Sequence, residues 1–219
     1  MSFWDWGWVA EHLGLFGDRL LQHLYLTVLA VAIGLAVSLP FAVLAHRRRR
    51  TYSPITWTTG IMYTIPSLAL LAMLTPFTGL SVLTAEIALV SYTLLILIRN
   101  TVTGLAAVPE DVKEAARGMG YSRRELLWKV EVPLALPAIV AGIRIATVTT
   151  IGLATVTALI GLGGLGGVMY GGFRGLYPEI AILVAVVLTV ALAVASDGAI
   201  LLLQQRVSPW ARSARVATR

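Results

Sequence analysis

Five stretches of the sequence are almost continuously apolar, and polar segments separate them. A helix needs about 20 apolar residues to cross the hydrocarbon core of a bilayer. The five stretches reach or approach that length: residues 20–45, 57–75, 80–98, 137–160 and 180–203. The pattern therefore predicts an all-α membrane protein with about five transmembrane helices, formed by one domain at 20–204.

The boundary between the second and third stretches is the least distinct. Only the short segment TPFTGL, which contains Pro76 and Gly79, lies between them. Such a turn can join two separate spans, or it can form the tip of a single re-entrant hairpin.

A polar segment, residues 104–136, follows the third stretch and has helix signals of its own. Pro109 suits the first position of a helix, and Glu110 and Asp111 follow it where carboxylates favour the positive end of the helix dipole. Apolar residues then recur at i, i+3, i+4 and i+7, which places them on one narrow face; they are Val112, Ala115, Ala116 and Met119.

A second helix start lies in the same segment. Two glycines, of which Gly120 is the second, allow the chain to leave the first helix. Ser122 with Glu125 three residues later has the pattern of a capping box. We expect Pro133 and Pro137 to end this helix before the fourth span. The small-sided face of the first helix favours a protein partner, because a helix lying on lipid, which is the alternative, usually carries bulkier anchors.

Composition supports the membrane class. Hydrophobic residues make up 58% of the 219 residues, charged residues 13%, and the mean hydropathy is +0.83. A soluble domain of this length needs more polar surface. The net charge of +6 could indicate a nucleic-acid partner, but the HRRRR run at 46–50 ends a span, so we expect no nucleic acid. The sequence has no cysteine and hence no disulfide.

The basic residues predict the orientation. With five spans, the segments after spans one, three and five lie on one side of the membrane, and cytoplasmic loops are enriched in Lys and Arg. We therefore expect the N-terminus outside and the C-terminus inside, with a basic cytoplasmic tail at 205–219. Fourteen of the seventeen basic residues lie on the predicted cytoplasmic side: Arg47, Arg48, Arg49, Arg50, Arg99, Lys113, Arg117, Arg123, Arg124, Lys129, Arg206, Arg212, Arg215 and Arg219.

Residues 1–19 precede the first span. Trp4, Trp6 and Trp8 predict a segment at the membrane surface, where indole rings prefer the headgroup level; an aromatic tail without a fixed place is the alternative. The segment has no basic start and no small-residue cleavage site, so it lacks the pattern of a signal peptide.

Several stretches resemble one family of membrane proteins. EAA at 114–116, Gly120 and VEVP at 130–133 resemble the EAA loop of permease subunits in bacterial type I ABC importers, with valine at both aliphatic positions of that family's Ile-x-Leu-Pro. Further stretches resemble the osmoprotectant branch of the family: TIPSLALLAML (64–74), RNTVTGL (99–105), KVEVPLALPAIVAGIR (129–144) and ALIGLGGLG (158–166).

The resemblance implies a MetI-like fold in the bacterial plasma membrane. The partners that it implies are cytoplasmic ATPase subunits, a second permease copy or a paralogue, and an extracytoplasmic substrate-binding protein. It also implies that the EAA loop docks on the ATPase and transmits closure to the spans through Glu114, Ala115, Ala116, Arg117 and Gly120. The implied cargo is glycine betaine, choline, carnitine or a related quaternary ammonium compound. An amino acid or ergothioneine is the alternative cargo, and a non-transporting scaffold or sensor is the alternative function.

The chain lacks the residues needed to hydrolyse ATP. A P-loop requires Gly-Lys-Ser/Thr, but neither Lys113 nor Lys129 follows a glycine. We expect a non-catalytic subunit without a cofactor or metal, whose partner ATPase binds ATP and magnesium. Gly161, Gly163 and Gly166 match GxGxxG but follow a span, whereas a dinucleotide site requires a strand before them. We expect a tight outer loop there, either a gate or a connector.

Two sets of polar residues lie within the predicted spans. Thr147, Thr150 and Thr157 share one helix face, which could line a translocation path or pack helices together. Tyr92 is a further candidate for the path, although no aromatic cluster for a quaternary ammonium is evident, so we expect tight recognition by the separate binding protein. Arg144 and Asp197 lie at similar depth, which predicts an ion pair fixing the fourth and fifth spans.

Overall fold

The computed structural model describes residues 4–208, and these residues form helices joined by short connections. Within this range, four helical runs are long and apolar enough to cross a membrane, and the bent pair α3–α4 makes a fifth if the two helices cross as one broken span. The four are α2 (Leu13–Arg47), α5 (Val82–Ala106), the run Arg123–Ile160 and α10 (Glu179–Val207). The prediction of an all-α protein with about five spans is confirmed.

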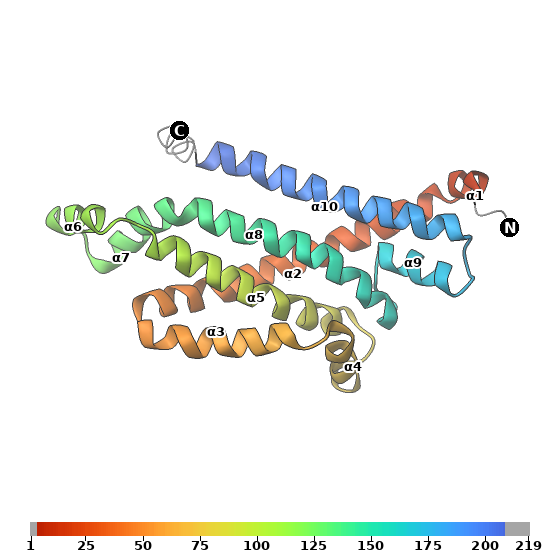
Figure 1. The fold of residues 1–219 in the computed structure, drawn as a ribbon, viewed down its shortest axis with the longest axis horizontal. Coiled ribbons are helices and arrows are strands. Elements are labelled where there is room, and N and C mark those ends of the chain that lie inside the picture. The colour runs from red at the N-terminus through yellow and green to blue at the C-terminus, as the bar shows by residue number, and fades with distance from the viewer. Residues whose placement is uncertain (1–3, 209–219) are drawn as a thin grey trace.

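The spans lie side by side and alternate in direction, as Figure 1 shows. The short helices α1 (Trp6–Glu11) and α9 (Leu165–Phe173) lie at one end of the bundle. At the other end, α6 (Glu110–Gly118) and α7 (Arg123–Leu126) project beyond the spans, and α10 finishes at this same end. The polar segment between the third and fourth spans therefore forms one tip of the molecule.

Helix α5 is central and packs against both α2 and the fourth span. Glycines allow these close approaches, because small residues let the backbones of membrane helices come together. A Cβ atom on Gly34 would lie 2.0 Å from Thr93 Oγ1, and one on Gly142 would lie 2.6 Å from Asn100 Cβ. The largest apolar cluster joins α2, α4, α5 and the end of the fourth span; its buried members are Leu26, Ala30, Leu71, Ala85, Ala88, Leu89, Ala154 and Ile160.

The second span is not continuous, so the expectation of one helix over residues 57–75 is wrong. Helix α3 (Arg49–Thr64) ends before Pro66, and α4 (Ser67–Thr78) continues at an angle of 94° to it. A residue that precedes proline is disfavoured in the helical conformation, and Ile65 accordingly has an extended backbone with ψ of 127°. Helix α5 has 25 residues and is long enough to cross by itself, so the bent pair α3–α4 is either a broken span or a re-entrant loop.

The fourth span begins earlier than predicted, and Pro133 and Pro137 do not end a separate helix. Helix α7 continues through a π-helical turn, η1 (Leu127–Glu131), directly into α8 (Val132–Ala154). A proline normally clashes with the carbonyl four residues earlier. For Pro133 that residue is Lys129, which lies in the wider π turn, and a wider turn relieves the crowding. The polar tip is thus joined to the span by unbroken helix.

The glycine-rich stretch forms a compact turn between the 3-10 helix η2 (Thr155–Ile160) and α9. Gly161 has a φ of 83°, which favours glycine. A Cβ atom on Gly166 would lie 2.3 Å from the Thr155 carbonyl oxygen, so this position must stay small. The tight packing favours a connector over a mobile gate.

Candidate coupling segment and cargo path

Helix α6 is built and capped as its sequence indicates. Pro109 is the N-cap, one position before the predicted place. Gly120 has a φ of 85° and ends the helix, where the Tyr121 N–H donates to the Ala116 carbonyl over 3.1 Å. The Glu110 carboxylate accepts hydrogen bonds from Arg117 Nη1 at 2.9 Å and Lys113 Nζ at 3.3 Å. These two bonds, the one from Arg117 above all, lower the pKa of Glu110.

The faces of α6 differ from the simple apolar face that the spacing predicts. Ala116 and Lys113 face inward, with only 2% and 8% of their surfaces exposed. Glu114, Ala115 and Arg117 are exposed. Met119, which the pattern groups with Ala116, is 70% exposed. One side of α6 therefore anchors the helix to its own chain, while the other presents a small alanine between charged neighbours.

The capping box at the start of α7 is confirmed. The Glu125 N–H donates to Ser122 Oγ at 3.3 Å, and the Ser122 N–H donates back to Glu125 Oε2 at 3.1 Å. Because α7, η1 and α8 form one run, a force applied at the α6–α7 tip acts directly on the fourth span.

The threonine face of the fourth span lies inside the subunit. Thr150 and Thr157 are each 1% exposed, and Thr147 is 9% exposed. The hydroxyls of Thr147 and Thr157 donate within their own helix, to Ile143 and Ala154, over 2.8 Å each. This burial agrees with the packing alternative, and the role of these residues in a path stays a prediction.

Arg144 and Asp197 are in contact across α8 and α10. Arg144 Nε donates to Asp197 Oδ1 at 2.7 Å, and Arg144 Nη2 donates to Asp197 Oδ2 at 2.6 Å. This two-bond geometry is the strong form of an arginine–carboxylate pair. The pair neutralises both charges within the subunit.

Tyr92 stabilises the break between α3 and α4. Its hydroxyl donates to the Ile65 carbonyl, which lies in the break, and its ring packs edge to face on Tyr63 with 5.9 Å between centroids. Tyr92 itself is 5% exposed, so it acts as a buried packing partner of Tyr63 and not as part of the surface.

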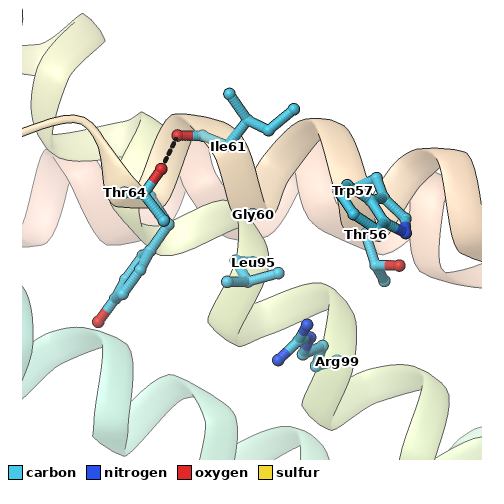
Figure 2. A pocket seen from close by; sticks show the side chains of 8 residues that line it. Thr56, Trp57, Gly60, Ile61, Thr64, Leu95 and Arg99 are labelled. Carbon is cyan, nitrogen blue, oxygen red and sulfur yellow. Dashed lines mark hydrogen bonds between the residues drawn. The ribbon is translucent and has the colours of Figure 1, made fainter.

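A cavity of about 410 Å³ lies between α3 and α5, and sequence reasoning missed it (Figure 2). The sequence pattern placed Arg99 just beyond the third span, but Arg99 lies inside α5, seven residues before its end. Spacing along the chain gave no sign of the cavity, because its two walls are far apart in sequence. The lining residues are Thr56, Trp57, Gly60, Ile61, Tyr63, Thr64, Leu95 and Arg99.

Comparison with known proteins decides the family. Residues 30–209 match the family model described as "Binding-protein-dependent transport system inner membrane component". The chain belongs to this family. Members of the family are membrane subunits of ABC transporters, and the chain is accordingly a multi-pass inner-membrane permease subunit.

Two relatives from Bacillus subtilis are similar over most of their length. The glycine betaine/carnitine/choline transport system permease protein OpuCB is 37% identical over 188 residues, which are 86% of each chain. The choline transport system permease protein OpuBB is 36% identical over 188 residues, again 86% of each chain. Among solved structures, the inward-facing MetNI methionine ABC transporter has a TM-score of 0.79 at 24% identity, covering 90% of this chain and 98% of the other. This last likeness shows that the MetI-like fold is correct.

Proposed function

We propose that this permease subunit imports quaternary ammonium osmoprotectants such as glycine betaine, choline or carnitine, driven by a partner ATPase. In this proposal α6 docks on the ATPase through Glu114, Ala115 and Arg117, and Gly120 sets the end of that helix. A second permease copy or a paralogue completes the pore, and a separate extracytoplasmic protein delivers the cargo.

One observation carries the coupling role. Helix α6 projects beyond the bundle, with Ala116 and Lys113 packed inward and Ala115 left exposed. A residue as small as alanine lets a partner surface approach the helix backbone closely. The unbroken run from α7 into α8 gives the partner a rigid connection to the fourth span.

The cargo class rests on the relatives. Proteins named for glycine betaine, carnitine and choline transport are 36–37% identical to this chain along most of its length. The likeness to the methionine transporter supports the fold alone, because its identity is 24%. An amino acid is therefore the weaker alternative.

The test is ATPase activity in a reconstituted complex of this permease, its ATPase and its binding protein. We expect glycine betaine, carnitine or choline to stimulate ATP hydrolysis and to accumulate in vesicles, while amino acids do neither. If an amino acid stimulated ATP hydrolysis instead, the cargo would be an amino acid. If nothing were transported, a non-transporting scaffold would be favoured.

The orientation has its own test, since it depends on the basic residues. The sequence has no cysteine, so a cysteine introduced at Arg117 is the only thiol in the chain. We expect a membrane-impermeant thiol reagent to label Arg117→Cys only from the cytoplasmic side. Labelling from the outer side would reverse the topology and would also exclude the ATPase contact.

A further inference from the structure

An arginine inside the third span, Arg99, has no hydrogen-bond or ion-pair partner among residues 4–208. Arg99 lies roughly 10 Å from the end of α5, taking a rise of about 1.5 Å per residue. It is exposed, and it makes no hydrogen bond or ion pair with the residues that the structure describes. Charged residues within a span pair with one another or face water, because hydrocarbon does not solvate them. The Arg99 guanidinium therefore faces water, a ligand, another chain or the headgroup level, and not the middle of the lipid tails.

The surroundings of Arg99 form an open hollow that is large enough for a small molecule. Figure 2 shows Arg99 and Leu95 on α5 opposite the turns of α3 that carry Trp57 and Gly60. Gly60 leaves the floor of the cavity open, since a Cβ atom there would meet nothing within 4 Å. The volume of about 410 Å³ lies within the range of about 300–1,000 Å³ that is usual for ligand sites.

The cavity presents two complementary chemistries. Trp57 is 71% exposed and Tyr63 is 39% exposed, so aromatic surface is available on the α3 side. The ring of Tyr63 is held by Tyr92, whose hydroxyl is bonded to the Ile65 carbonyl. On the α5 side the free guanidinium of Arg99 offers paired N–H donors. Among the described residues, the lining of the cavity includes no aspartate or glutamate.

Each chemistry selects one part of a ligand. A quaternary ammonium has no N–H to donate, so aromatic faces attract it through cation–π interaction. A carboxylate accepts two parallel hydrogen bonds from a guanidinium. A molecule that carries both groups can occupy the α3 and α5 sides of the cavity together.

The geometry points to a transient cargo site for zwitterionic quaternary ammonium compounds in this cavity. Arg99 binds the carboxylate of the cargo, and Trp57 and Tyr63 face its ammonium group. This inference rests on the proposed function and adds that the site distinguishes cargoes with a carboxylate from cargoes without one. Choline carries the ammonium but has a hydroxyl in place of the carboxylate. Arg99 therefore matters for glycine betaine and carnitine, whereas Trp57 matters for choline as well.

The test compares transport of glycine betaine and choline by reconstituted complexes that share one ATPase and one binding protein. We expect Arg99→Gln to lower glycine betaine transport about tenfold or more, the usual effect of losing a hydrogen bond to a charged group, while choline transport stays close to wild type. Arg99→Lys keeps the positive charge but loses the paired N–H donors, so its glycine betaine transport should lie between those of wild type and Arg99→Gln. Trp57→Leu lowers transport of both cargoes, and Trp57→Phe retains most of it.

The control is Arg206→Gln, which removes an exposed arginine at the end of α10 and leaves both cargoes unaffected. An equal loss of both cargoes in Arg99→Gln together with poorer assembly would overturn the inference and make Arg99 an interface residue paired with the second permease copy. Unchanged transport of both would overturn it too. If the wild-type complex carries neither compound, the proposed function itself has failed.

Discussion

Arg144 and Arg99 both lie within membrane spans, yet their surroundings differ. Arg144 on α8 is held by two hydrogen bonds to Asp197 on α10. Arg99 on α5 faces a cavity beside α3 and has no partner among the described residues. The outer surface of α10 is apolar, with exposed Val187, Val190 and Val194. The comparison indicates that the α10 side is complete within one subunit and suits lipid, while the α3–α5 side needs water, cargo or another chain.

The largest effect is expected at the paired arginine. Asp197→Ala leaves the Arg144 charge uncompensated between two spans, and an uncompensated charge is far more costly than the loss of a whole pair. We expect most of the assembled complex to be lost, as measured by its yield as a single species after detergent extraction.

The double variant Asp197→Ala with Arg144→Gln tests that cause. Removing both charges should restore much of the yield, whereas Arg99→Gln alone should never lower it. Equal yields for Asp197→Ala and wild type would show that the pair does not hold α8 and α10 together.

Helix α6 has a buried alanine, Ala116, next to an exposed one, Ala115. Ala115→Trp places a bulky ring on the side of α6 that is exposed among the described residues, so the subunit should fold while cargo-stimulated ATP hydrolysis falls almost to the basal rate. Arg206→Trp at the same end of the bundle is the matched control. Normal stimulation in Ala115→Trp would remove α6 from the coupling role.

The threonine face allows a smaller test. Thr150→Val has nearly the same shape and removes only the hydroxyl of a residue that is 1% exposed. If the predicted path includes this face, transport slows severalfold while ATPase binding is retained. Unchanged uptake would leave Thr150 a packing residue and would strengthen the case for the α3–α5 side.

Tyr92→Phe tests the support behind the cavity. It removes the hydrogen bond to the Ile65 carbonyl and leaves the ring, so we expect a loss of about 1 kcal/mol in stability. The measurement is a thermal unfolding shift of the purified complex. A shift with no change in cargo preference would show that Tyr92 acts only on the break between α3 and α4.

The smallest effect concerns pH. Arg117 and Lys113 lower the pKa of Glu110, so this carboxylate adds to the stability of α6 fully above its ordinary pKa of about 4.5, and the contribution is lost as the pH falls through the lowered value. Coupling should therefore be constant over about pH 6 to 8 with respect to this group. Glu110→Gln should weaken coupling slightly across that range, and a strong pH dependence that this variant abolishes would contradict the assignment.

Local signals predicted much of the fold. Apolar run length predicted the spans, and the capping box at Ser122 is confirmed because both of its partners lie within four residues. The likeness of the 114–133 segment to the EAA loop agrees with the family match. The sequence also placed Arg144 and Asp197 level with each other, because helix length converts residue number into depth.

Features that depend on packing were not predicted. The 94° break at Ile65 lies in an apolar run whose average hydropathy hides it. Pro133 was expected to end a helix, since the π turn that accommodates it has no evident sequence signal. Trp57 and Arg99 come from different helices, so their shared cavity exists only once α3 packs on α5. Residues 209–219 of the predicted basic tail lie outside the described residues.

The difference between the two faces can be measured as their accessibility to water. In this naturally cysteine-free chain, Gly60→Cys places one thiol in the α3–α5 cavity and Val194→Cys places one on the exposed surface of α10. We predict that a small hydrophilic thiol reagent labels Gly60→Cys in the membrane-embedded complex, whereas Val194→Cys stays unlabelled. The labelling rate of Gly60→Cys should change while the complex transports glycine betaine. An inert Gly60→Cys beside a reactive Val194→Cys would contradict the account.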